Sequence, residues 1–365
     1  MLKNKTIAVV IPAYNEETQI KDVIESMPDF VDRIIVVNDC SKDKTSEIVK
    51  TFWQTKYNSG NEIKNITTQN IEGRFERANR ALQNQMKLEL NYFVPSEVVN
   101  TNPETDRIIL INQLNNSGVG STIARGYKWC KDHGIDCTAV MAGDGQMDPA
   151  ELESICKPVV EENIDYVKGN RLIHRSALLV IPKIRYFGNS ILSILTKIAS
   201  GYWHVSDTQC GYTAISLKAL QSIRIYDIYK SYGMPNDMLV KLNIAFCSLR
   251  EVEIKPVYDI GENSKMKIGK VIPRISWLLF KSFFKRLWQK YLFRDFHPLF
   301  LLYNLSFLLL ILSIPYFIKI IRTIALGMQS GTLPVLAFFF LFITGIQFLL
   351  FAMWMDIQDN ERLYK

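Results

Sequence analysis

Two long uncharged stretches near the carboxyl end constrain this chain more than any other feature. Pro298 to Ile318 is a run of 21 residues without a formal charge, and Thr323 to Met355 is a run of 33. A helix crosses the hydrocarbon core of a bilayer with about 20 apolar residues. Neither stretch has a polar face to turn toward water, which disfavours the alternative of two buried core helices. We therefore predict two transmembrane helices, at about 298–320 and 333–355.

Charge is concentrated beside these stretches. Residues 264–365 carry 13 Lys and Arg against four Asp and Glu, a net of +9, so with +7 overall the first 263 residues carry −2. The segment 264–296 interleaves basic with aromatic residues, as amphipathic helices on anionic membrane lipids do. A nucleic-acid patch is the weaker interpretation, because the segment adjoins a predicted span. We expect no nucleic-acid partner.

The same asymmetry predicts the orientation in the membrane. By the positive-inside rule the basic segment is cytoplasmic, and the short connection at 319–331 crosses to the far side. The part of the chain before these stretches and both termini are then cytoplasmic. The six cysteines lack metal-ligand spacing and fit a reducing compartment.

The remaining residues, 1–263, alternate β-branched runs with helical stretches, which indicates an α/β domain with a mostly parallel sheet. The expected strands are Ile7–Ile11, Arg33–Val37, Arg107–Ile111, Thr138–Met141 and one near Tyr166–Lys168. The expected helices are Glu17–Ser26, Thr45–Thr51, Gly120–Lys131 and Ala150–Glu162. A polar insert at 52–104, with one helical segment around Ile71–Leu90, is interpreted as a helical excursion over the sheet edge. Segments 264–296 and 297–365 follow as the interface segment and the transmembrane hairpin.

Unusual loops follow four of these strands. They are Pro12–Glu16, Asn38–Ser41, Asn115–Gly120 and Asp144–Pro149. In α/β folds ligands gather at the carboxyl edge of the sheet, so we expect all four loops to face one cleft.

Two of these loops suggest nucleotide binding. The Asp39 carboxylate can accept hydrogen bonds from a base or a ribose, or it can cap the helix that follows. Gly118 and Gly120 allow the backbone to approach a phosphate at a helix amino terminus. The loop lacks the GxGxxG and GK[ST] spacings, which disfavours hydride transfer and ATP hydrolysis.

Asp144 is the most specific single indication of a ligand-binding site. It ends a strand and is followed by Gly145, Gln146 and the helix start Asp148-Pro149. A hard cation such as Mg²⁺ or Mn²⁺ takes oxygen ligands and bridges protein carboxylates to phosphates, so Asp144 and the Gln146 carbonyl are credible metal ligands. A turn stabilised by the Asp144 side chain is the alternative.

Five motifs in order carry a family resemblance: IPAYNEE, VVNDCSKDKT, NNSGVGSTIARG, AGDGQMDP and SDTQCGYTAIS. Over residues 7 to about 270 the chain resembles inverting family-2 glycosyltransferases, specifically the membrane-tethered polyprenyl-phosphate glycosyltransferases similar to dolichol-phosphate mannose synthase. The resemblance implies a GT-A-like, Rossmann-like domain that binds a nucleotide sugar.

The resemblance also implies roles for individual residues. Those implied to bind the nucleotide are Pro12, Tyr14, Glu16 and Asp39, and those implied to hold the divalent metal are Asp144 and Gln146. The chain departs from the family pattern at Ala142, where the Asp-x-Asp motif has its first Asp. It also has Asn38-Asp39-Cys40-Ser41 where Asp-Asp-Gly-Ser is common.

The resemblance implies that the sugar is transferred to a polyprenyl phosphate, and this anionic acceptor needs cationic groups to bind it. Arg171, Arg185 and the cluster Ser264, Lys265 and Lys267 are candidates to supply them, with solvated surface charge as the alternative. Asp207 and Gln209 match a family motif at the sugar and acceptor end of the cleft. Asp237 stands where relatives that use hydroxyl acceptors carry a catalytic carboxylate.

Together these features predict a metal-assisted transferase that moves one sugar from a UDP- or GDP-linked donor to an undecaprenyl or dolichyl phosphate at the cytoplasmic leaflet. Two alternatives stay open: transfer to a hydroxyl of a lipid-linked glycan or surface polysaccharide, and a catalytically dead membrane scaffold. Oligomer formation through the hairpin is also left open.

Overall fold

The computed structural model describes residues 2–55, 62–63, 65–67, 75–181, 183–257, 268–329 and 331–365. Its centre is an eight-stranded sheet with the order β3-β4-β2-β1-β5-β7-β6-β8. The strands are β1 (Ile7–Ala13), β2 (Arg33–Asn38), β3 (Ser96–Val98), β4 (Ile108–Gln113), β5 (Cys137–Val140), β6 (Tyr166–Asn170), β7 (Thr213–Ser216) and β8 (Leu249–Glu253).

The sheet is mostly parallel, as predicted. β1 pairs in parallel with both β2 and β5, and β2 pairs in parallel with β4. β3 and β7 run antiparallel to their neighbours. The carboxyl ends of β1, β2, β4 and β5 therefore lie along one edge, where the four loops with unusual residues begin.

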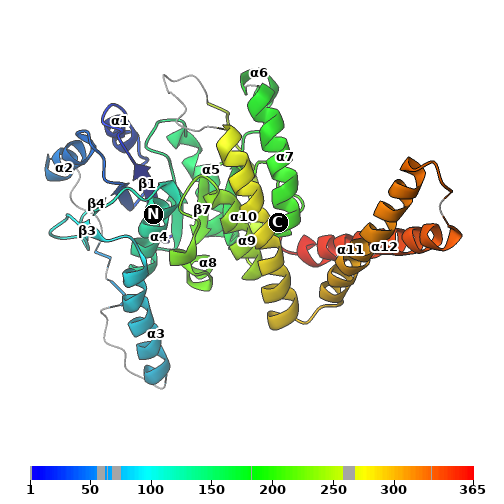
Figure 1. The fold of residues 1–365 in the computed structure, drawn as a ribbon. Coiled ribbons are helices and arrows are strands. Elements are labelled where there is room, and N and C mark those ends of the chain that lie inside the picture. The colour runs from blue at the N-terminus through cyan, green and yellow to red at the C-terminus, as the bar shows by residue number, and fades with distance from the viewer. Residues whose placement is uncertain are drawn as a thin grey trace.

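Helices cover both faces of the sheet and bury its apolar side chains (Figure 1). One face packs against α4 (Val119–Asp132), α8 (Leu217–Ser222) and α9 (Met234–Ile244). The other packs against α1 (Ile20–Glu25), α2 (Thr45–Thr55) and α5 (Leu152–Glu162). α6 (Ala177–Val180) and α7 (Lys183–Ser200) complete the domain, with short helical turns η1 (Leu90–Tyr92), η2 (Pro149–Glu151) and η3 (Ile225–Asp227) between elements.

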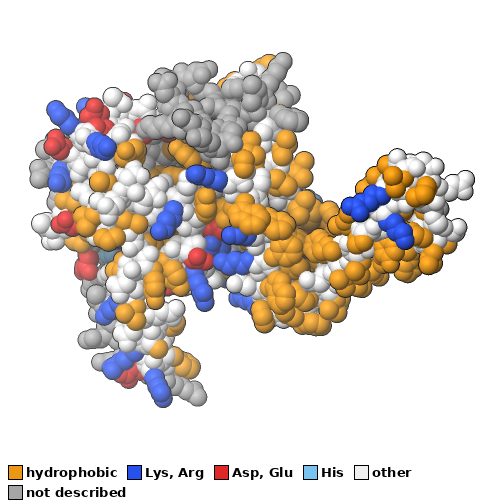
Figure 2. All heavy atoms as spheres, in the orientation of Figure 1, with side chains coloured by type: hydrophobic (Ala, Val, Ile, Leu, Met, Phe, Trp, Pro, Cys, Tyr) orange, Lys and Arg blue, Asp and Glu red, His pale blue; other side chains and the backbone are white. Residues whose placement is uncertain are grey.

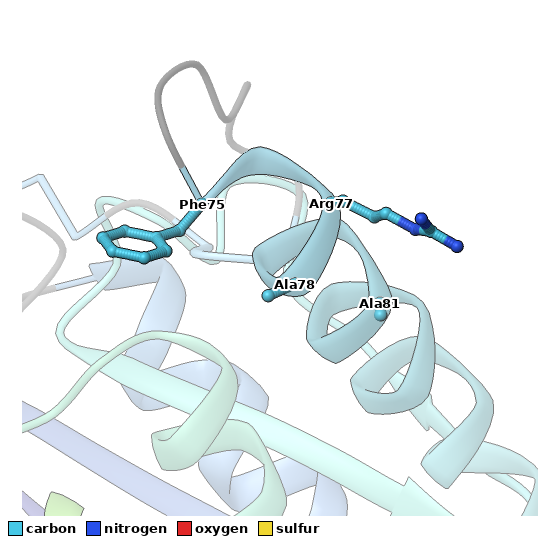
Figure 3. Close-up of a pocket in the computed structure, with 4 residues that line it drawn as sticks. All are labelled: Phe75, Arg77, Ala78 and Ala81. Atoms are coloured by element: carbon cyan, nitrogen blue, oxygen red, sulfur yellow. The ribbon is translucent and has the colours of Figure 1, made fainter.

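The insert adds an edge strand and a projecting helix. β3 pairs with β4 at the sheet edge, and α3 (Glu76–Glu89) extends away from the body (Figure 1). Glu89 at its base pairs with the buried Lys128 and Lys131 of α4. A hollow of about 450 Å³ beside α3 is lined by Phe75, Arg77, Ala78 and Ala81 (Figure 3). None of the predicted site residues lines it.

The interface segment forms one long helix, α10 (Ile268–Trp288), which continues into a π-helix, η4 (Gln289–Arg294). Its apolar face, including Ile275, Leu279 and Phe283, packs on α7, α9 and the hairpin. Arg274 and Lys281 are exposed, whereas Arg286 and Lys290 are buried in the protein. Part of the basic run therefore serves contacts inside the protein rather than a lipid surface.

The carboxyl-terminal hairpin consists of α11 (Pro298–Ala325) and α12 (Thr332–Glu361), both long and apolar enough to cross a membrane. In the most apolar 18-residue stretch of each helix only 17% and 11% is buried, so they are not core helices. Apolar side chains cover the hairpin where it leaves the domain (Figure 2). The two helices meet closely at Gly345, whose carbonyl accepts a 2.8 Å hydrogen bond from Ser306 Oγ.

Candidate active site

The loop after β1 is tied to the loop after β2. The Asn15 N–H donates to Ser41 Oγ at 3.0 Å, and the Glu16 N–H donates to Thr45 Oγ1 at 2.9 Å. Pro12, Tyr14 and Glu16 are half-buried along this loop. The first two predicted nucleotide-binding segments therefore form one connected surface.

Asp39 is buried, with 4% of its surface exposed, and it bridges to the loop after β4. Its Oδ1 accepts hydrogen bonds from the Ser117 N–H at 2.8 Å and from Ser117 Oγ at 3.2 Å. Its Oδ2 accepts one from the Gly118 N–H at 2.9 Å. The interpretation of Asp39 as a helix cap is wrong, because Asp43 accepts the Thr45 N–H at the start of α2. In this structure Asp39 shapes the candidate nucleotide loop.

Cys40 has a strained backbone at the position where the motif of the resembled family has glycine. Its φ is +58°, in the left-handed region where a side chain other than glycine costs about 1–2 kcal/mol. The common Asp-Asp-Gly-Ser motif has glycine at this position. The turn is therefore retained here with strain, and such strain is typical of functional loops.

Gly118 and Gly120 pack against the backbone of residues 229–230. Gly118 has a φ of +92°, and a Cβ there would lie 2.5 Å from the Lys230 carbonyl oxygen. The Gly120 N–H donates to that same oxygen at 3.0 Å. Close backbone packing thus explains both glycines, and contact with a phosphate stays a prediction for them.

Gly120→Ala is expected to destabilise the fold by about 1–3 kcal/mol or more, because the added Cβ would lie 2.0 Å from the Tyr229 carbonyl oxygen. Gly188→Ala in α7 is the matched control, since a Cβ there meets nothing within 4 Å. Thermal unfolding in detergent measures both. Equal stability of the two variants would contradict the packing argument.

Asp144 lies in the loop after β5, beside the loop after β1. The Cβ position of Gly143 is 3.3 Å from the Pro12 carbonyl oxygen and 3.7 Å from Glu16 Cγ. Asp144 is half-buried, and its Oδ1 accepts the Gln146 N–H at 3.1 Å, so the predicted side-chain turn is present. Among the residues that the structure describes, no cation pairs with this carboxylate. Asp144 can therefore both hold the turn and offer an oxygen to a ligand.

These groups fit a divalent cation that is shared with a substrate. In the described part of the chain no three His, Cys, Asp or Glu side chains converge as metal ligands. Mg²⁺ commonly uses one or two carboxylates together with substrate phosphates. Asp144 supplies one such carboxylate, and the Gln146 carbonyl stays a predicted ligand, whereas a metal cage built entirely from protein ligands is not present among the described residues.

The loop after β6 places an ion pair near the Asp144 loop. Arg171 Nε and Nη2 donate to the two carboxylate oxygens of Asp207 at 2.8 and 3.1 Å. Asp207 is 1% exposed and also accepts the Cys210 N–H at 3.1 Å. Burial disfavours ionised Asp207, but Arg171 and Lys168 outweigh it and hold the pKa of the carboxyl below its ordinary value. The pair fixes a guanidinium at the carboxyl end of β6.

Side chains from three elements organise the 205–211 loop. Gln209 Nε2 donates to Asn236 Oδ1 of α9 at 2.9 Å, and Thr196 Oγ1 of α7 donates to the same oxygen at 2.9 Å. Glu251 of β8 accepts the N–H groups of Ser206 and Asp207. Gln209 is thus a fixed part of the loop in this structure.

The Asp144 loop and the 205–211 loop are in contact. The Tyr212 hydroxyl donates to the Asp148 carbonyl at 3.0 Å. The Cβ position of Gly211 lies 3.4 Å from Met147 Cε. The structure therefore joins the predicted metal loop to the predicted acceptor loop.

Asp237 lies in the first turn of α9 and is 5% exposed. Its Oδ2 accepts the Tyr229 N–H at 2.9 Å and pairs with Lys241. By holding Tyr229, Asp237 supports the 229–230 backbone to which the Gly120 N–H donates. Gly120 follows Gly118, whose N–H donates to Asp39. The Asp237 carboxylate is engaged inside the protein.

Some predicted residues cannot be placed with these. Ser264, Lys265 and Lys267 lie outside the described residues, and Arg185 is described only as part of the α7 backbone. Three residues that shape the site were not anticipated: Lys168, Asn236 and Glu251. Lys168 is fully buried, which lowers its pKa, and its Nζ donates to the Cys210 carbonyl. A charged residue inside a strand pattern was the available signal for Lys168.

Comparison with known proteins identifies the class of enzyme. The model of "Glycosyl transferase family 2" matches residues 8–84. A Methanococcus voltae UDP-N-acetylglucosamine–dolichyl-phosphate N-acetylglucosaminyltransferase is 26% identical over 272 residues, 73% of this chain and 93% of that protein. A Trichomonas vaginalis dolichyl-phosphate beta-glucosyltransferase, ALG5D, is 22% identical over 77% of this chain and 74% of that protein. Among solved structures, M. tuberculosis glucosyl-3-phosphoglycerate synthase aligns with a TM-score of 0.47 and 16% identity, over 78% and 81% of the two chains.

The chain is a glycosyltransferase. The family 2 glycosyl transferase model matches its amino-terminal part, and the resemblance inferred from the motifs is confirmed. The interpretation as a catalytically dead scaffold is not supported.

Proposed function

We propose that this enzyme transfers a single sugar from a nucleotide-linked donor to a polyprenyl phosphate at the cytoplasmic leaflet. Two relatives are named for transfer to dolichyl phosphate, and one of those names specifies a UDP-linked donor. A UDP-sugar is therefore the first donor to test and a GDP-sugar the second.

One observation carries the proposal: the Asp144 loop contacts a loop that holds an arginine, in a domain joined to an apolar hairpin. A donor diphosphate needs a cation beside a carboxylate, and a lipid phosphate needs a cationic group close to the membrane. Asp144 and Arg171 are the residues that we propose for these two roles.

The chemistry follows from charge. Cleavage of the sugar–phosphate bond leaves negative charge on the departing diphosphate, and stabilising that charge lowers the barrier. A bound Mg²⁺ or Mn²⁺, held by Asp144 and the Gln146 carbonyl, would supply this stabilisation as a Lewis acid. A monoalkyl phosphate has a second pKa near 6 and is largely ionised at neutral pH. Such an acceptor attacks without a protein base, and Arg171 positions it.

The test is transfer of radiolabelled sugar from a panel of UDP- and GDP-linked donors into organic solvent, with undecaprenyl or dolichyl phosphate as acceptor. We expect lipid-soluble product with at least one donor, dependent on added Mg²⁺ or Mn²⁺. Product that forms only with a lipid-linked glycan would favour the hydroxyl acceptor instead. Protease protection of the catalytic domain in sealed inside-out vesicles tests its orientation, and exposure to the protease is expected.

Asp237→Asn separates the two acceptor chemistries. We expect transfer to decrease by less than about tenfold, because the carboxylate is engaged with the Tyr229 N–H and Lys241. Loss of a true general base costs about 10²–10⁴-fold. Steady-state rates with a fixed donor measure the effect. A decrease within the larger range, with the fold intact, would favour a hydroxyl acceptor.

A further inference from the structure

The near end of the hairpin is bound into the catalytic domain by buried polar groups. Arg286 of α10 is 1% exposed, and Asp356 of α12 is fully buried. Arg286 Nη1 and Nη2 donate to the two oxygens of Asp356 at 2.7 and 2.8 Å. The same guanidinium donates to the carbonyls of Ala199 and Ile198 at the end of α7. One side chain thus links the interface helix, the second apolar helix and the catalytic domain.

A second set of contacts reaches α9. Lys290 Nζ donates to Asn243 Oδ1 of α9 at 3.1 Å and pairs with Asp359 of α12 at 3.2 Å. Asn243 Nδ2 donates to Asn360 Oδ1 of α12 at 2.7 Å. Burial lowers the pKa of Lys290 to about 8, and Asp359 acts against that shift.

The π-helix η4 brings two of these side chains together. Lys290 and Tyr291 are both buried in η4, and the Tyr291 hydroxyl donates to Asp356 Oδ1 at 2.7 Å. π-helical turns are rare and concentrate at functional sites. We call the group of Arg286, Lys290, Tyr291, Asn243, Asp356 and Asn360 the polar clamp.

The chain after α12 strengthens this attachment. The Leu249 N–H of β8 donates to the Leu363 carbonyl at 2.7 Å, and the Lys365 N–H donates to the Leu249 carbonyl at 2.9 Å. Leu363 is buried in the core of the domain. In Figure 1 α12 returns to the domain beside α10, which runs across the direction of the hairpin.

The clamp acts on the helices that also build the site. α9 carries Asn243 of the clamp and Asn236, which binds Gln209. α7 ends at the carbonyls bound by Arg286 and carries Thr196, which also binds Asn236. Replacing buried ion pairs by apolar residues of similar volume is often neutral or stabilising, so adhesion alone does not require this clamp. Buried polar contacts can instead fix the relative geometry of the helices, as they do in some proteins.

We propose that the polar clamp sets the height and angle of the candidate active site over the membrane, with Arg286 and Asp356 as positioning residues for a membrane-embedded acceptor. This inference rests on the proposed function for the identity of the acceptor, a lipid phosphate. A polyprenyl phosphate held in the bilayer reaches the candidate active site only if that site lies at the correct height, whereas a short water-soluble prenyl phosphate reaches it by diffusion.

The kinetic test compares Asp356→Asn with the unchanged chain in nanodiscs. We expect kcat/KM for embedded polyprenyl phosphate to decrease at least about tenfold through KM, and kcat/KM for a short water-soluble prenyl phosphate to change less than about threefold. Lys285→Ala is the control on the same helix, because Lys285 pairs with Asp227 at the surface and should alter neither value. Equal losses with both acceptors, or no loss with either, would overturn the proposal.

A second variant covers failure to fold. Arg286→Met with Asp356→Leu removes both charges and leaves no unpaired buried ion. We expect this variant to fold and to show, like Asp356→Asn, a higher KM for the embedded acceptor than the unchanged chain. Recovery of the unchanged KM would overturn the positioning role.

A substrate-free measurement separates this inference from the proposed function. Cys40 is exposed and the other five cysteines are buried, so Cys40 can be spin-labelled selectively. A second label on Met328→Cys, at an exposed position of the hairpin, then reports the distance from the candidate active site to the hairpin. We expect a narrow distance distribution that broadens in Asp356→Asn. An unchanged distribution would contradict the clamp. Absence of transfer to any lipid phosphate by the unchanged chain would refute only the proposed function.

Discussion

Asp144→Ala is expected to reduce glycosyl transfer by about 10³-fold or more while the protein stays folded. The substitution removes the carboxylate proposed to hold the cation on the donor diphosphate, and electrostatic stabilisation of developing charge is usually the largest catalytic contribution. The folding cost is small, because the half-buried side chain accepts one hydrogen bond, from the Gln146 N–H, in the described structure. Rates with saturating donor and a titration of Mg²⁺ measure the effect.

The matched control for Asp144 lies in the same loop. Asp148→Asn removes a carboxylate four residues away but keeps an oxygen to cap η2, where Asp148 Oδ1 accepts the Ala150 N–H at 2.9 Å. We expect its rate to stay within about threefold of the unchanged chain. Because Ala142 stands where the motif of the resembled family has its first Asp, Asp144 is the aspartate of that motif left as the proposed cation ligand. Unimpaired transfer by Asp144→Ala would rule out its metal role.

Asp207→Ala is expected to cost about 3–5 kcal/mol of stability and to decrease transfer by at least about 100-fold. Removal of one partner of a buried ion pair leaves the other charge uncompensated. Here Arg171 would lose both carboxylate contacts, and Lys168 would lose one of its nearby carboxylates. Thermal unfolding in detergent and acceptor kinetics measure the two effects.

Two further variants distinguish positioning of Arg171 from general stability. Arg171→Lys keeps the charge but loses the two-point contact with Asp207, so we expect acceptor KM to rise with little change in unfolding temperature. Glu162→Ala is the surface control, because its pair with Arg250 is exposed, and neither activity nor unfolding temperature should change. An Arg171→Lys enzyme with unchanged acceptor kinetics would contradict the positioning role.

Strong local patterns made five of the eight strands predictable. β1, β2, β4, β5 and β6 are buried strands, and each was placed within about two residues of its observed bounds. β7 was missed because its residues lie inside the motif SDTQCGYTAIS, which was interpreted as part of a site rather than as a strand. α9 was missed because its residues are buried nearly all round and show little polar periodicity.

The site was predictable where a loop follows a buried strand. The sequence alone correctly indicated that the loops carrying Glu16, Asp39, Gly118 and Asp144 would meet at one edge. It gave no means to see that Asp39 and Asp237 use their carboxylates inside the protein, since those partners, Gly118 and Tyr229, are set by tertiary packing. For the same reason it did not reveal that Arg286 and Lys290 face the hairpin end rather than lipid.

The most direct test of the proposed function is identification of the reaction product by mass spectrometry and NMR after incubation with polyprenyl phosphate, Mg²⁺ and the donor that supports transfer. We expect one sugar joined to the lipid through a phosphodiester, with inverted anomeric configuration. A sugar joined to a hydroxyl, or a lipid phosphate that stays unmodified with every donor, would contradict it.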